Sequence, residues 1–183
     1  LCAAPLRAQQ RPLVTEDPEP VGAGRVLVES GVDLLKGVQY PVSGLEGHLL
    51  RIPLVGVSVG VSSIAEIQID QASISHLAIT RRYRAPLSNL LTATGASTSD
   101  ADDVLIGAKV RLAAETARRP AFGFRFATKL PNAGNESGLG LDTTDFLASV
   151  LAAKTTASVR LVGNVGVGIL ADPTSGNSQN DVL

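Results

Sequence analysis

The stretch DVLIGAKVRLAAE, residues 103–115, decides the fold class because apolar and polar side chains alternate along it. One parity is apolar: Val104, Ile106, Ala108, Val110 and Leu112. The other parity carries the charges: Asp103, Lys109, Arg111 and Glu115. Successive side chains of a β-strand point to opposite faces, so the stretch predicts a strand with one apolar and one charged face. Its length is about that of a strand crossing a bilayer at a tilt, roughly 9 to 11 residues.

Other segments alternate in the same way along the chain. We predict strands at 25–35, 48–61, 66–75, 103–115, 121–129, 145–154 and 158–170, with Val182 and Leu183 as the start of an eighth. In the second segment, the apolar residues change parity. Leu50, Ile52 and Leu54 occupy even positions, whereas Val55, Val57, Val59 and Val61 occupy odd positions. A bulge near Pro53 to Gly56 would place both sets on one face.

The connections between these segments alternate between short and long. Short turns are predicted at 62–65, 116–120 and 155–157, and longer loops at 36–47, 76–102, 130–144 and 171–181. This rhythm is typical of outer-membrane barrels, whose turns lie on the periplasmic side and whose longer loops lie outside. The fold class expected is therefore all-β: an antiparallel up-and-down transmembrane β-barrel, incomplete, with about seven to eight strands in this chain.

Two other structures fit parts of the pattern. A soluble β-sandwich or lipocalin-like barrel also has alternating strands. Aromatic residues make up only 3% of the chain, with no Trp, whereas membrane barrels usually carry aromatic girdles. Residues 100–118 and 144–154 can also be drawn as helices, since Phe146, Leu147, Val150 and Leu151 recur at three- and four-residue spacing.

The charge balance limits the classes of partner, and the N-terminal residues indicate the domain organisation. With 16 basic and 17 acidic residues, no net field favours nucleic acid. We interpret residues 1–8 as a signal-peptide remnant cleaved at Ala8/Gln9, which would remove Cys2; the bulky Leu1 disfavours the lipoprotein alternative. Residues 9–24 would form a Pro-rich periplasmic lead, and residues 25–183 the N-terminal portion of the barrel.

The charged parity of the predicted strands defines the candidate site, a lumen-facing set of mixed sign. Its members are Glu29, Asp33, Glu66, Asp70, Lys109, Arg111, Arg125, Lys129 and Arg160. Such a lumen could pair its own charges or select permeant ions. The residues leave both alternatives open.

Motifs for catalysis and metal binding are weak. Residues 56–60, GVSVG, match the G-x-S-x-G nucleophile elbow, but another strand follows where that motif needs a helix. The acidic residues near 100–103 and 136–145 lack the spacing of a calcium loop. Arg81, Arg82 and Arg84 could contact lipopolysaccharide phosphates or form a solvated loop. We expect no catalytic activity, no metal and no cofactor.

Several stretches resemble a known family: RPLVTEDP (11–18), YPVSGLEG (40–47), ATKLP (127–131), GLGLDTTDF (138–146) and GNVG (163–166). They are similar to the bacterial outer-membrane transporter-like barrels named for the meta-pathway of phenol degradation. The resemblance implies a Gram-negative outer-membrane barrel of roughly a dozen strands, consistent with even strand numbers. Its C-terminal strands would then lie outside this chain. The family's name adds hydrophobic aromatic compounds as candidate solutes, and it supplies no catalytic residues.

The function expected from these observations is passage of small solutes, hydrophobic ones among the candidates, through a passive channel or transporter in the outer membrane. Outer-membrane lipid and lipopolysaccharide would be its partners. The alternative is a soluble β-rich periplasmic binding or structural domain, of the sandwich or lipocalin-like type.

Overall fold

The computed structural model describes residues 15–174 and the backbone of residues 179–182. The expected signal-peptide remnant, its cleavage site, Cys2 and Leu183 lie outside the described residues. Every regular element of the described part is a β-strand. No helix in that part is long and apolar enough to cross a membrane.

The strands form one antiparallel sheet in which neighbours follow chain order. The strands are β1 (Val26–Tyr40), β2 (Leu45–Gly60), β3 (Ala65–Ala72), β4 (Ile74–Arg82), β5 (Ser97–Ala101), β6 (Leu105–Ala113), β7 (Ala121–Lys129), β8 (Asp145–Thr156), β9 (Val159–Ala171) and β10 (Gln179–Val182). The two halves of β2 pair with β4 and with β3, so β3 and β4 are one strand interrupted at Ser73. β5 and β6 likewise continue one another along β4 and β3. The segments therefore make eight successive strands of a meander.

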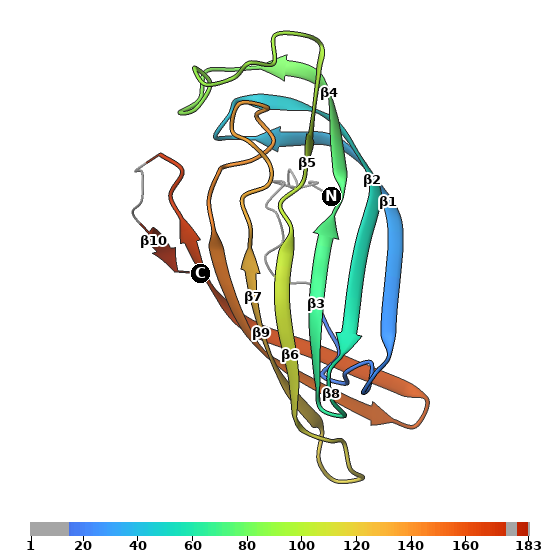
Figure 1. Ribbon diagram of the computed structural model, residues 1–183. Coiled ribbons are helices and arrows are strands. Elements are labelled where there is room, and N and C mark those ends of the chain that lie inside the picture. The colour runs from blue at the N-terminus through green and yellow to red at the C-terminus, as the bar shows by residue number, and fades with distance from the viewer. Residues whose placement is uncertain (1–14, 175–178, 183) are drawn as a thin grey trace, which may run out of the picture.

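The sheet is strongly curled and open on one side, a half-barrel (Figure 1). β1 lies at one end of the strand order and β10 at the other. This confirms the predicted fold class in its coarse form: all-β, antiparallel, up-and-down and incomplete as a barrel. The helical alternative for residues 100–118 and 144–154 is wrong, since these residues contain β6 and β8.

Two predicted loops are largely extended, which corrects the loops drawn at 36–47 and 76–102. β1 runs to Tyr40 and reaches β2 through the turn at 41–44, and β4 and β5 occupy both ends of the second loop. The inward side chains here are apolar and buried, and form one cluster: Val38, Leu45, Leu49, Leu77 and Leu139. Because the inward residues are apolar here, the two faces of each strand differ little in polarity, and the sequence shows no alternation with a period of two residues.

The predicted irregularity in β2 is confirmed. The register with β1 shifts between Gly31 and Asp33, opposite Leu54 and Arg51. As a result Leu50 pairs with Leu34 and Val57 pairs with Val28, although Leu50 and Val57 have opposite parities. Because cross-strand partners lie on the same face, the bulge places Leu50 on the face of Val57, whereas Leu54, the partner of Gly31, lies on the opposite face.

Antiparallel order places the connections at two ends of the half-barrel. One end, named here the turn end, carries residues 61–64, 114–120 and 157–158. The opposite end, the loop end, carries residues 41–44, 83–96 and 130–144. Figure 1 shows the long loops (green and orange) at the top and the 114–120 connection (yellow) at the bottom.

Candidate functional site

The outer face of the sheet is an exposed apolar surface. Val165 is 78% exposed, Leu34 77% and Leu112 67%. The apolar parity extends across neighbouring strands through Ile67, Ile69, Ile106, Phe122, Phe124, Phe126, Phe146, Val150, Val167 and Ile169. The Phe126 and Phe146 rings stack with centroids 6.3 Å apart. Soluble monomers rarely expose continuous apolar patches of this extent, so the surface is suited to an apolar environment.

The opposite face, called the inner face, carries buried charge. Glu66 is 1% exposed, Lys109 5% and Lys129 6%. Acidic and basic side chains are almost never buried this deeply unless they are paired. Each of the three takes part in ion pairs on this face.

Strand register builds the centre of the inner face. Glu66 of β3 is the cross-strand partner of Lys109 of β6, which in turn is the partner of Arg125 of β7. Lys109 Nζ lies 2.9 Å from Glu66 Oε1. Arg125 Nη2 donates to Asp70 Oδ2 at 2.7 Å, and its Nε donates to Gln68 Oε1 at 2.7 Å. Alternation along each strand is thus what gathers these groups into one cluster.

Residues 15–25, named here the N-terminal segment, lie against this cluster and belong to no strand. Glu16 Oε1 lies 2.9 Å from Lys109 Nζ, and Glu16 Oε2 lies 2.9 Å from Arg125 Nε. Gln68 Nε2 donates a further hydrogen bond to Glu16 Oε1. The carboxylate of Glu16 is therefore held on both oxygens by groups of the sheet.

The same segment makes further polar contacts toward the turn end. Arg160 Nη2 donates to Asp17 Oδ1 at 2.8 Å, and Arg111 pairs with Glu19. The Val21 backbone N–H donates to Glu66 Oε2 at 2.5 Å. These pairs connect the segment to β3, β6 and β9, so it lies across the part of the inner face that is nearest the turn end.

Two glycines of the sheet, Gly60 and Gly123, allow the N-terminal segment to approach the strands closely. A Cβ atom on Gly123 would lie 2.9 Å from the Cβ of Pro18, which is fully buried. A Cβ on Gly60 would lie only 1.8 Å from the Gly22 carbonyl oxygen, and Gly24 N donates to Gly60 O at 2.8 Å. Any side chain at either position would force the backbone of the segment to move.

Hydrogen bonding shifts the pKa of two carboxyls near the turn end. The hydrogen bond from Arg160 is the main reason that the pKa of Asp17 lies below its ordinary value, although partial burial acts in the opposite direction. The Thr155 backbone N–H, 2.8 Å from Glu115 Oε1, lowers the pKa of the half-buried Glu115 carboxyl. Arg160 Nη1 also donates to Glu115 Oε2 at 2.9 Å, so Arg160 joins the two carboxylates.

Further charge pairs lie toward the loop end of the inner face. Lys129 Nζ lies 2.9 Å from Asp145 Oδ2 and 3.2 Å from Asp103 Oδ2. Arg51 Nε lies 3.1 Å from Asp102 Oδ2, and its Nη1 lies 3.9 Å from Asp33 Oδ2. Each cation thus sits between two carboxylates from different strands or loops.

The structure places the predicted site residues in these clusters. All of them except Glu29 take part in the ion pairs given above: Asp33, Glu66, Asp70, Lys109, Arg111, Arg125, Lys129 and Arg160. Glu29 is exposed and pairs in register with Gly56. The sequence analysis placed Asp103 and Glu115 on the charged parity but not in the site, and it did not predict the other partners as site residues: Glu16, Asp17, Glu19, Arg51, Asp102 and Asp145. The acidic run of residues 16–19 was the available signal for Glu16, Asp17 and Glu19.

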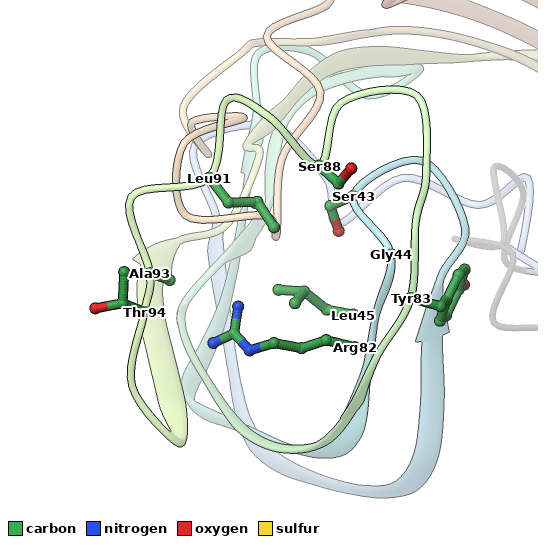
Figure 2. A pocket seen from close by; sticks show the side chains of 9 residues that line it. All are labelled: Ser43, Gly44, Leu45, Arg82, Tyr83, Ser88, Leu91, Ala93 and Thr94. Atoms are coloured by element: carbon green, nitrogen blue, oxygen red, sulfur yellow. The ribbon is translucent and has the colours of Figure 1, made fainter.

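A shallow cavity of about 350 Å³ lies at the loop end (Figure 2). Leu45, Arg82 and Leu91 project toward its centre, and Ser43 and Ser88 stand at one side. Arg82 Nη2 donates to the Gly95 carbonyl oxygen at 2.6 Å. Leu45 and Leu91 belong to or pack on the apolar cluster, so the cavity lies over the core of the loop end.

Catalytic and metal chemistry find little support in the geometry of residues 15–174. Ser58 of the GVSVG stretch lies inside β2, and a turn and β3 follow it instead of a helix. No group of three or more His, Cys, Asp or Glu side chains in the described part of the chain is arranged to hold a metal ion.

Comparisons with known proteins assign no family. No protein-family model, curated protein or solved structure matches this chain. The chemistry of the two faces and of the segment on the inner face therefore carries the functional argument.

Proposed function

We propose that this chain is part of an outer-membrane β-barrel that acts as a passive channel or transporter for small solutes. The observation that carries the proposal is the division of one sheet into an exposed apolar outer face and a charged, ion-paired inner face. Hydrocarbon requires apolar side chains at alternate positions on the outside, while a polar lumen accommodates charge inside. Strands paired along a meander also satisfy the backbone groups that lipid cannot.

Orientation follows from the two ends. The turn end would face the periplasm and the loop end the outside, as in other barrels of this kind. Arg81, Arg82 and Arg84 lie at the loop end, where their guanidinium groups suit the phosphates of lipopolysaccharide. Arg81 already pairs with Glu46 at 2.5 Å, and Arg82 donates to the Gly95 carbonyl oxygen, which leaves Arg84 as the better candidate for such contacts.

The alternative, a soluble periplasmic β-domain, requires a cover for the outer face. Burying apolar surface stabilises a protein by roughly 25 cal/mol per Å², so water-exposed Val, Leu, Ile and Phe side chains forgo that gain. Side chains as exposed as Val165 and Leu34 therefore favour lipid over water as the neighbour of this face.

Reconstitution of the full-length protein in a planar lipid bilayer tests the proposal. We expect stepwise ohmic currents after insertion. A chain carrying Val165→Arg serves as the control, because insertion should be impaired when the charge faces lipid. A protein that folds in water without detergent or lipid, and that carries no current, would contradict the proposal.

A further inference from the structure

We propose that Lys109, Arg125 and Gln68 form a binding site for the carboxylate of a small organic anion, and that Glu16 occupies this site as a ligand supplied by the chain itself. The role of that anion as a solute rests on the channel function proposed above. The site itself rests on the contacts of Glu16.

The contacts of Glu16 are those of a bound carboxylate. One oxygen accepts hydrogen bonds from Lys109 Nζ at 2.9 Å and from Gln68 Nε2. The other oxygen lies in an ion pair 2.9 Å from Arg125 Nε, whose single N–H donates to Gln68 Oε1. These groups come from three adjacent strands of the sheet: β3, β6 and β7. Bonds between ionised donors and a carboxylate are among the stronger and more selective contacts in proteins. Any free carboxylate of similar size would meet the same donors.

The wall groups remain fixed by contacts that do not involve Glu16. Lys109 is 5% exposed and keeps its pair with Glu66. Arg125 keeps its bonds to Asp70 and to Gln68 Oε1. The site is therefore preorganised, and an incoming ligand would pay little to order it.

The N-terminal segment is attached in a way that permits exchange. Residues 15–21 form no strand, and they contact the wall through the side-chain pairs of Glu16, Asp17 and Glu19, the Val21–Glu66 bond and the buried ring of Pro18. Without the segment, five cations face four carboxylates on this part of the wall: Lys109, Arg111, Arg125, Lys154 and Arg160 against Glu29, Glu66, Asp70 and Glu115. The balance of charge on this part of the wall then favours an anion.

The position of Pro18 indicates the chemistry of the part of the ligand that lies beside its carboxylate. Its ring is fully buried and lies over Gly123, whose cross-strand partners include Leu151 of β8. When the segment leaves, this recess is open to a short apolar body beside the carboxylate site. The chemical class that fits is a small monocarboxylate with an apolar end, for which propionate is a suitable probe.

Chemical rescue in the full chain, folded in detergent micelles, tests the site directly. Glu16→Ala should lower the midpoint of thermal unfolding by about 5 °C, the order expected when one charge-assisted contact is lost in a chain of this size. Sodium propionate should restore most of this loss, and sodium chloride at equal ionic strength should not. The matched control is Glu136→Ala, because Glu136 is an exposed acid of the 130–144 loop away from the inner face.

A second variant ties the rescue to the site. Adding Arg125→Gln to Glu16→Ala should abolish the propionate effect. If that double variant does not fold, line broadening of carboxyl-labelled propionate in the NMR spectrum provides the comparison. A propionate line that is broadened more by the Glu16→Ala chain than by the unaltered chain supports the site. Equal propionate effects on all chains, or an effect of chloride as large as that of propionate, would overturn it.

The outcomes separate this inference from the channel proposal. Rescue by propionate in a protein that carries no bilayer current would retain the site and contradict the channel. Current through the bilayer without any propionate rescue would retain the channel and overturn the site. In a conducting protein, Glu16→Ala should also shift the reversal potential in a propionate gradient toward anion selectivity.

Discussion

The inner face differs between its two ends, and the difference shows which physical signals a sequence carries. Toward the turn end, the inner side chains are charged and meet the N-terminal segment through ion pairs. Toward the loop end, the inner face carries the ion pairs of Lys129 and Arg51 and also an apolar core of Leu45, Leu49 and Leu77, which Leu139 of the 130–144 loop covers. The turn end is thus filled by polar contacts to the N-terminal segment, and the loop end owes most of its packing to apolar side chains of strands and a loop.

Breaking the central charge cluster should have the largest effect on stability. Lys109→Met leaves Glu66 buried with its cation gone, and removing one partner of a buried pair costs about 3–5 kcal/mol. Urea titration in micelles measures the change, with exposed Lys36→Met as the control. Adding Glu66→Gln should recover part of the loss; no recovery would show that the pair is not the cause.

The apolar end should respond almost as strongly but through cavity formation. Leu77→Ala removes a side chain that is 0% exposed, and such truncations cost about 2–5 kcal/mol. The same titration measures this cost, and Leu112→Ala on the exposed outer face is the matched control. If Leu77→Ala left the free energy of unfolding unchanged while Lys109→Met lowered it strongly, the charged end alone would determine stability.

Placing a charge on the outer face should affect membrane folding and spare the inner face. Val165→Arg should cost about 2–4 kcal/mol if the site lies near the bilayer midplane. Folding yield into lipid vesicles, followed by circular dichroism, measures this cost, and Val165→Leu is the control. Equal yields for Arg and Leu would show that lipid does not contact Val165.

Low pH should produce the smallest effect and release only the N-terminal segment. The pKa of Asp17 lies below its ordinary value of about 3.8, so its pair with Arg160 stabilises the bound segment above that pH and is lost as the pH falls through the lower value. Glu19, Glu115 and Lys109 also act near this carboxyl. The protection of the amides of residues 15–25, measured as the exchange rate relative to the intrinsic rate at each pH, should fall below about pH 4. With Asp17→Asn, the fall should be smaller; an unchanged profile would contradict the role of Asp17.

The contrast between the two ends explains how much the sequence predicted. Where inner residues are charged, alternation identified the strands: the predicted segment 121–129 coincides with β7, and the parities of β6 separate Lys109 from Ile106 as the structure does. Where inner residues are apolar, as at Leu77, both faces are apolar or weakly polar and the extension of the strands was missed. Hydrophobic period alone cannot mark a strand whose two faces have similar polarity.

Of the candidate site, the sequence predicted the residues on the strands but not their partners in the N-terminal segment. Strand parity indicated the wall residues, because their positions follow from local geometry. Their partners Glu16, Asp17 and Glu19 lie in a segment without a period, and the contact with Lys109 joins residues 93 positions apart in the chain. Such long-range contacts depend on the tertiary arrangement, so no local pattern revealed them.

Glu66 connects the state of the N-terminal segment to the hydration of the wall. Its Oε1 receives Gln68 Nε2 and Lys109, and its Oε2 receives the Val21 N–H. When the segment departs, Oε2 loses a donor in a place that is now 1% exposed. A water molecule is the natural replacement for that donor. In the proposed exchange, release of the segment and hydration of the inner face therefore occur in the same step, and a carboxylate ligand would enter a site that already contains water.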